Sequence, residues 1–156
     1  MRTSFITDRN EIDELIHQCD ICFIGIIERD GTPYVIPMNF GYNGEELILH
    51  SGPEGKHLNL LALDNRITVT FCTERKLVNQ HPDVACSYSM FSKSVMCKGR
   101  VSFIEDLTEK EAAMNVTMKN YTNRLFKYSK PALTNVKVWR VTIEEITAKA
   151  FGQNFK

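Results

Sequence analysis

Apolar residues recur at every second position over several stretches of the chain, which is the period of a strand with one buried face. The pattern is clearest in residues 67–73, where Ile67, Val69 and Phe71 alternate with threonine and cysteine. Further strands are predicted at 84–91, 94–104 and 138–149, with the pattern broken at 79–83. These stretches predict a protein built mainly of strands.

Turn signals connect the apolar runs in the first third of the chain. The runs 21–28 and 34–40 are separated by Arg29-Asp30-Gly31, which predicts a first hairpin. Asn43-Gly44 predicts a second hairpin that leads into the strand residues Leu47-Ile48-Leu49. Strands joined in this way pair antiparallel.

Two positions in the late strands predict irregular pairing. Gly99 lies inside the predicted strand 94–104 and indicates a bulge or a close approach of two backbones. The apolar alternation of the last strand slips out of register at Ile146, and a bulge near Glu144-Glu145 explains that slip.

Three segments have helical periodicity. Asp8 and Glu11 have the spacing of a capping box and predict a helix over residues 9–18, while the leucines of 58–63 predict a short buried helix. A second capping box at 108–111 precedes a stripe at helical spacing, which is more often core than a cofactor site. The stripe consists of Met114, Met118, Tyr121 and Leu125.

Six or seven strands joined by hairpins favour an antiparallel β-barrel with helices over a doubly wound sheet. A chain of 156 residues without repeats, linkers or low-complexity tracts is predicted to form a single domain, residues 1–156.

Charge and hydropathy narrow the classes of partner. The 19 basic residues equal the 19 acidic ones, so nothing favours nonspecific binding to nucleic acid or to an anionic membrane. No run of about 18 apolar residues occurs, and the first residues lack a signal-peptide pattern. A cytoplasmic protein is expected, in which any anion is held by a local site.

Five scattered cysteines argue against a disulfide framework. Cys19 and Cys22 have C-x-x-C spacing, but the pair follows a predicted helix instead of opening one, and zinc would need two more ligands, for which His17, His81 and Cys86 are candidates. Buried packing cysteines are the preferred interpretation, and no metal site is predicted.

The stretch from His50 to Lys56 carries the strongest signal for a binding site. His50-Ser51-Gly52-Pro53-Glu54-Gly55-Lys56 joins the end of a strand to the start of a helix. A phosphate there would meet backbone N–H groups near Gly55, the Lys56 ammonium and the Ser51 hydroxyl. Without further support, Lys56 is equally well an exposed lysine on a first helical turn, and Ser51 equally well begins the turn.

Motifs in a fixed order point to a family. The strand around Pro37, the hairpin and the His-Ser-x-x-x-Gly-Lys turn are followed by residues 92–101, which look like a Tyr-x-Ser-Val-x-x-x-Gly-Arg strand, and by the ending Thr147-Ala148-Lys149. The order, over residues 19–149, resembles that of the flavin-binding pyridoxamine-phosphate-oxidase-like split barrels, and among them the 5-nitroimidazole-resistance (Nim) group. Ser92 replaces the family's usual aromatic residue, and Ala148 its usual glycine.

This resemblance implies a six-stranded antiparallel split barrel that forms a homodimer and binds flavin mononucleotide (FMN) in clefts at the subunit interface. It places Ile36, Pro37, Met38 and Asn39 at the isoalloxazine ring and raises Ser51, Gly55 and Lys56 to phosphate contacts. Lys93 and Ser94 match a second phosphate-side strand that comes from the partner subunit, although an ordinary solvent-facing edge explains them equally well. Trp139 is a candidate for stacking at the edge of the ring, but burial of the single tryptophan is the simpler account.

His50 is the candidate catalytic residue. Imidazole titrates near neutral pH and can donate a hydrogen bond or a proton to charge that develops beside a flavin. The Nim resemblance places a histidine of this segment near the ring, whereas a strand-end histidine is otherwise more often structural.

The sequence therefore predicts a flavin-dependent reductase that passes electrons from a donor, such as a reduced nicotinamide, to a small acceptor such as a 5-nitroimidazole. A non-catalytic flavin-binding or sensing protein is one alternative. A haem-binding split-barrel relative is another, with His50, His57 or His81 as the axial ligand.

Overall fold

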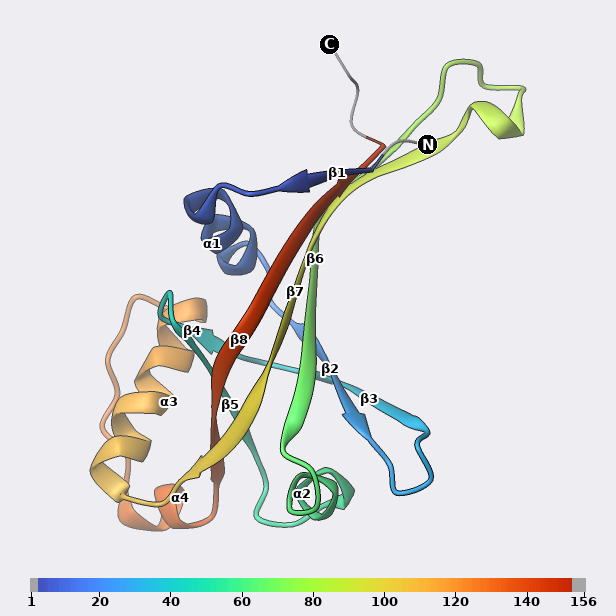
Figure 1. Cartoon of the computed structure of the whole chain (residues 1–156). Helices are drawn as coiled ribbons and strands as arrows, with labels where there is room; N and C mark the ends of the chain where they lie inside the picture. Colours follow the sequence, from blue (N-terminus) through green and yellow to red (C-terminus); the bar gives the residue numbers. More distant parts are fainter. Residues whose placement is uncertain (1–2, 153–156) are drawn as a thin grey trace.

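Eight antiparallel strands of one sheet form the framework of the molecule (Figure 1). The computed structural model describes residues 3–152. The strands are β1 (Thr3–Ile6), β2 (Cys22–Ile27), β3 (Pro33–Met38), β4 (Gly41–Tyr42), β5 (Glu46–Ser51), β6 (Arg66–Val78), β7 (Ser89–Ile104) and β8 (Lys137–Phe151). The helices are α1 (Arg9–His17), α2 (Lys56–Leu61), α3 (Leu107–Tyr121) and α4 (Lys130–Thr134), with a 3₁₀ turn at Ala85–Ser87.

The mainly β, antiparallel fold predicted from the alternation is confirmed, but its strand count was too low. The sheet runs β3-β2-β6-β7-β8-β5-β4, and β1 pairs with the end of β8. β1 was missed because its residues are largely exposed, and only the pairing of 3–6 with 148–151 makes it a strand. Short α4 was also missed, although Ser129 caps it.

The core lies between the inner faces of the strands. Ile24, Val69 and Phe71 are buried at the alternate positions that the period of two predicts, and Leu15 and Ile16 of α1 pack against the same core. The first hairpin is confirmed by the pairing of β2 with β3, and the second by the pairing of β4 with β5.

Both predicted irregularities occur where β7 meets β8. Lys98 pairs with Glu145 and Gly99 pairs with Ile143, so Glu144 is the extra residue of a bulge. A Cβ at Gly99 would collide with the carbonyl oxygen of Thr142, which requires glycine there. The bulge and the close backbone approach are two aspects of one feature.

One long strand replaces the two that were predicted at 84–91 and 94–104. Residues 85–87 form the 3₁₀ turn, and β7 then runs without a break from Ser89 to Ile104. The far ends of β6 and β7, residues 76–91, project beyond the sheet as an arm (Figure 1). Glu74, at φ 53°, lies where the β6–β7 register shifts at the base of the arm.

The helix starts were predicted with different success. Asp8 accepts a hydrogen bond from the Glu11 amide at 2.8 Å, so the first cap is confirmed. The second was wrong by two residues, because Asp106 instead of Thr108 caps α3 by accepting from the Glu109 amide at 2.9 Å. An aspartate at the N-cap satisfies this amide as well as a threonine does.

The predicted stripe of α3 is wrong in part. Its fully buried residues are Lys110, Ala113 and Thr117, whereas Met114 and Met118 are only partly buried. The helix ends at Tyr121, so Leu125 lies beyond it and is 80% exposed. Lys110 can be buried because its Nζ donates to the carbonyl oxygens of Leu133 and Val136.

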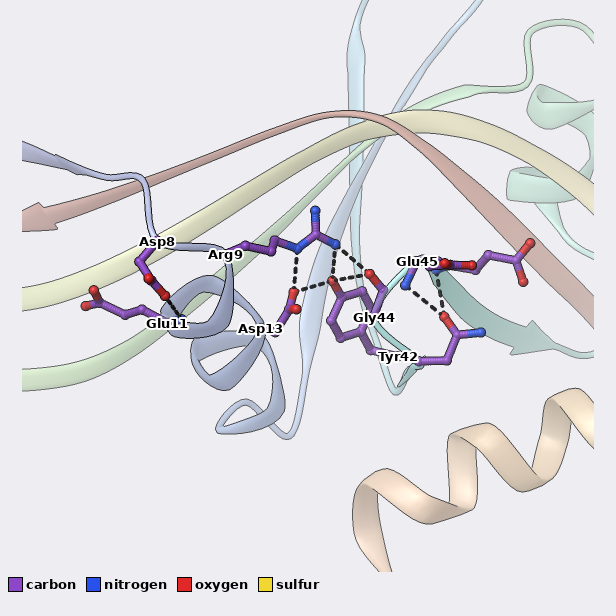
Figure 2. A network of polar contacts seen from close by, with 9 residues as sticks. Asp8, Arg9, Glu11, Asp13, Tyr42, Gly44 and Glu45 are labelled. Carbon is purple, nitrogen blue, oxygen red and sulfur yellow. Dashed lines mark hydrogen bonds and ion pairs between the residues drawn. The ribbon is translucent and has the colours of Figure 1, made fainter.

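A polar network attaches α1 to the β4–β5 hairpin (Figure 2). The Tyr42 hydroxyl donates to Asp13 Oδ1 at 2.6 Å and accepts from Arg9 at 2.9 Å, while Arg9 Nε donates to Asp13 at 2.9 Å. Arg9 also donates to the carbonyl oxygen of Gly44 in the hairpin turn. Burial and the Asp13 carboxylate raise the pKa of Tyr42, so the network holds a neutral phenol.

Candidate functional site

A cleft of about 310 Å³ lies where the end of β3 meets the end of β5. β3 pairs with β2 as far as Met38, and the chain then turns so that β4 pairs with β5. This change of partner brings the segment 36–39 beside His50. The residues that line the cleft are Ile36, Pro37, Met38, Asn39, His50 and His57.

The structure therefore brings together five of the residues that the sequence singled out. Pro37 is exposed, and the side chains of Ile36 and Met38 are partly buried against the core. The Asn39 amide donates to the carbonyl oxygen of Asp20 at 3.5 Å. The cleft has an apolar wall on the β3 side and imidazoles on the other.

The turn that follows β5 forms a second hollow, of about 560 Å³, lined by Pro53, Glu54, Gly55, Lys56, Leu58 and Asn59. Lys56, the first residue of α2, is half exposed. Its side chain reaches Glu28, with 2.8 Å between Nζ and the carboxylate. Its Nζ also lies 4.8 Å from the centre of the Tyr34 ring. An exposed ion pair of this kind contributes little stability, so the ammonium is available to a stronger anion.

Ser51 and Gly55 shape that turn. The Ser51 hydroxyl donates to the carbonyl oxygen of Gly52 at 2.9 Å. Gly55 has φ 152°, a backbone conformation that favours glycine. Because α2 has only six residues, Lys56 and these turn groups would contribute more to anion binding than the helix dipole.

His57 is a cleft residue that the sequence analysis did not place with the flavin site. Its ring lies 5.3 Å from that of Trp139, between centroids, with 34° between the planes. Trp139 has no exposed surface and also packs edge-on against Phe103. A ligand in the cleft would therefore contact His57, behind which Trp139 is buried. This agrees with the expectation that the single tryptophan is a core residue.

The two cleft histidines have similar electrostatics. Burial lowers the pKa of His50 and of His57 below the ordinary value, because desolvation disfavours the charged imidazolium. His50 Nδ1, His57 Nε2 and Trp139 Nε1 are buried and have no hydrogen-bond partner among the described residues. Orphaned buried polar atoms beside a cleft are the expected result where a bound molecule supplies the partner.

Lys93 and Ser94 line neither hollow. Lys93 is largely buried, with its Nζ 3.1 Å from carboxylate oxygens of both Glu11 and Glu74. Burial lowers the pKa of Lys93, but the two carboxylates together outweigh this effect and leave that pKa raised. Ser94 pairs across the sheet with Cys72 and Lys149. Contact of these residues with a ligand in a partner's cleft stays a prediction.

The cysteines are free, and the packing interpretation of the C-x-x-C pair is confirmed. Cys19, Cys22 and Cys97 are buried, while Cys72 and Cys86 are exposed. Burial raises the pKa of Cys22 and of Cys97 to about 12, which keeps these thiols protonated and unreactive. Among residues 3–152, no cluster of three or more His, Cys, Asp or Glu could hold a metal ion.

No described helix is both long and apolar enough to cross a membrane. The candidate site consists of two hollows formed by the sheet and the short α2. One lies at the end of β3 and the other at the turn before α2.

Comparisons with known proteins agree with this architecture. A solved structure from Bacteroides thetaiotaomicron, a protein to which 5-nitroimidazole antibiotic resistance has been ascribed, is 48% identical, with a TM-score of 0.87 over 96% of this chain and 87% of that one. The FAD and haem binding protein of Mycobacterium smegmatis is 20% identical, with a TM-score of 0.82 over 100% of this chain and 77% of that one. The flavocytochrome Anf3 of Azotobacter vinelandii is 20% identical, with a TM-score of 0.79 over 96% and 70%.

None of the curated proteins matches the chain. The sequence profile of the family described as pyridoxamine 5'-phosphate oxidase matches residues 8–150, which is most of the chain. Together with the 48% identity to the Bacteroides protein, this match confirms the resemblance predicted from the motifs. The chain belongs to the pyridoxamine 5'-phosphate oxidase family.

Proposed function

We propose that this protein binds FMN and is a flavin-dependent reductase of small acceptors such as nitroaromatic compounds, 5-nitroimidazoles included. The observation that carries the proposal is the convergence of residues 36–39 with His50 in one cleft, beside a turn that presents Lys56. The 48% identity to a protein to which 5-nitroimidazole resistance has been ascribed supports the choice of acceptor.

The cofactor fits the residues that are present. The orphaned ring nitrogens of His50 and His57 give the cleft unused hydrogen-bonding capacity, and its β3 wall is apolar as a flavin ring requires. Lys56 would hold the phosphate at the turn. Ser51 lines neither hollow, and its hydroxyl would have to turn away from the Gly52 carbonyl oxygen to donate to that phosphate. FMN, when bound, supplies the redox chemistry, accepting electrons from a donor such as a reduced nicotinamide and passing them to the acceptor.

The chain's own residues would orient the reactants and handle protons. Ile36 and Met38 would position the ring and keep water from one side of it. His50, which lines the cleft, would donate a hydrogen bond or a proton to the negative charge that builds up on the reduced acceptor. Its lowered pKa makes the neutral imidazole the main form at pH 7, which donates a hydrogen bond through its one N–H, while the minor imidazolium form would donate the proton.

We also propose that the protein acts as a homodimer. The outer face of the sheet exposes large apolar side chains on β2, β3 and β7, namely Phe23, Ile27, Val35 and Met96. A hollow of about 440 Å³, lined in part by Gly25, Ile27 and Thr68, lies on the same sheet. Exposed apolar patches of this kind typically mark interaction sites, and a second copy would also bring Lys93 and Ser94 to a partner's flavin.

The visible absorption spectrum of the purified protein, with the mass of any ligand released on denaturation, tests the cofactor. A flavin spectrum with release of FMN supports the proposal, whereas a Soret band would favour haem, and a colourless protein that takes up no added FMN would overturn it. Steady-state oxidation of a reduced nicotinamide with a 5-nitroimidazole then tests the reaction. A protein that binds FMN but turns over no acceptor is a flavin-binding protein and not a reductase.

A further inference from the structure

His57 lines the cleft, whereas its sequence neighbours Lys56 and Leu58 line the hollow at the turn. It follows Lys56 directly in α2, yet its side chain lines the cleft formed by residues 36–39 and His50 instead of the hollow at the turn. Two neighbouring residues of one helical turn thus serve different hollows. A flavin that fills both would meet them at different parts of its structure.

The position of the His57 ring depends on Trp139 and on Gly55. The ring packs against Trp139 with the two ring planes tilted by 34°, and that indole is fully buried and cannot move without disturbing the core. A Cβ at Gly55 would lie 2.5 Å from His57 Cε1, so a larger residue at position 55 would displace the ring from its present position. Such support is typical of a side chain that presents a fixed hydrogen-bonding group.

The chemistry of the two residues differs as well. Lys56 carries a permanent charge at a half-exposed position, which suits a phosphate dianion. His57 has a buried Nε2 without a partner among the described residues, and burial favours its neutral form. A neutral imidazole offers directed hydrogen bonds but no ionic attraction.

We propose that His57 is a further cofactor-contacting residue of this cleft, that it contacts the uncharged part of the flavin, either the ring or the sugar-alcohol chain, and that Trp139 and Gly55 act as its positioning residues. The inference rests on the proposed binding of FMN. It divides the cofactor between two adjacent residues, with the phosphate held by Lys56 and the remainder by His57.

Riboflavin separates these roles because it lacks the phosphate. Dissociation constants for FMN and riboflavin are measured by quenching of flavin fluorescence for the wild type, His57→Phe and Lys56→Ala. Phenylalanine keeps a ring against Trp139 and removes the nitrogens. His57→Phe is expected to weaken both ligands by the same factor, about two- to tenfold for one hydrogen bond. Lys56→Ala is expected to weaken FMN about tenfold or more and leave riboflavin unchanged.

The outcomes are distinct. A loss in His57→Phe confined to FMN would mean that His57 contacts the phosphate, and unchanged binding of both ligands would mean that it contacts neither; each overturns the inference. If the wild type binds neither ligand, the proposed function itself fails. His81→Phe is the matched control, because His81 lies on the arm and lines none of the hollows described here.

The positioning part has a readout that needs no cofactor. Gly55→Ala keeps both the imidazole and Lys56 but strains the backbone at φ 152° and crowds the His57 ring, so the fluorescence emission of Trp139, the single tryptophan, is expected to change in the cofactor-free protein. Riboflavin binding should weaken in the same variant. Gly31→Ala is the control, because Gly31 also has a positive φ, of 87°, lies outside both hollows, and has nothing within 4 Å of a Cβ. Unchanged emission with unchanged riboflavin affinity in Gly55→Ala would overturn the positioning role.

Discussion

At the scale of single residues, the chemistry of the cleft depends on how burial changes the protonation of its two histidines. His50 is the group expected to donate a hydrogen bond or a proton to the acceptor. Its replacement by glutamine keeps a hydrogen-bonding side chain but removes the group that titrates. We expect His50→Gln to lower turnover of a nitroaromatic acceptor about a hundredfold or more, with FMN affinity nearly unchanged. Steady-state rates together with flavin titrations check this, and wild-type turnover in the variant would contradict it.

The same histidines predict a pH dependence of stability. Burial lowers the pKa of His50 and His57 from 6.5, so the folded cofactor-free protein binds protons less tightly there than the unfolded chain does. Their contribution is therefore fully present above pH 6.5 and is lost as the pH falls through the lowered pKa values.

Urea unfolding of the cofactor-free protein between pH 7.5 and 5 measures that contribution. As the pH is lowered, the free energy of unfolding should decrease in the wild type and decrease less in the double variant His50→Gln/His57→Gln. Carboxylates with lowered pKa, such as Asp64 and Glu105, start from ordinary values of 3.8 and 4.5 and act mainly below this range. Identical slopes in the two proteins would reject the histidine assignment.

At the scale of elements, the close contact between β4 and α3 is a feature that the sequence does not predict. A Cβ at Gly41 would lie 2.6 Å from the Thr117 amide nitrogen and 2.8 Å from the Val116 carbonyl carbon. Since these are backbone atoms, the helix would have to move. The two segments lie far apart in the sequence, and no residue pattern near Gly41 predicts that a helix packs against it.

Gly41→Ala is therefore expected to destabilise the protein by about 1–3 kcal/mol, as overpacking does. Gly52→Ala, where a Cβ meets nothing within 4 Å, should change stability by less than about 0.5 kcal/mol. Thermal and urea unfolding of the two variants beside the wild type measure the difference. Equal stability of both variants would show that β4 and α3 do not pack so closely.

The predicted elements succeeded where the signal was local. Asp8 fixes the start of α1, and the slip at Ile146 located the bulge, because a cap and a register shift each leave a mark within a few residues. The α3 stripe was wrong in part, because Lys110 is buried with the help of two carbonyl acceptors from distant residues and the helix ends before Leu125. No periodicity of apolar residues can predict a buried lysine.

At the scale of the whole molecule, the exposed apolar face of the sheet predicts association. Phe23, Ile27, Val35 and Met96 are between 38% and 59% exposed. If two copies bury this face, Val35→Glu places a carboxylate in an apolar contact, which costs several kcal/mol.

Sedimentation is expected to show a dimer for the wild type and for the control Leu125→Glu, which changes an exposed loop residue, and largely monomer for Val35→Glu. FMN affinity should fall with dimerisation in Val35→Glu, because Lys93 and Ser94 would no longer reach a partner's site. A Val35→Glu protein that remains dimeric would place the interface elsewhere, with the arm, residues 76–91, as the next surface to test.

The family resemblance supplied the expectation that residues 36–39 belong to a flavin site. The sequence by itself determined the antiparallel β class, the two hairpins, the first helix cap and the bulge at Glu144. These follow from alternation, turn chemistry and spacing, which act over a few residues. Only the tertiary structure decided the pairing of β1, the continuous β7 and the place of His57 on Trp139. Those features depend on contacts between distant segments, whose burial and hydrogen bonds no local pattern contains.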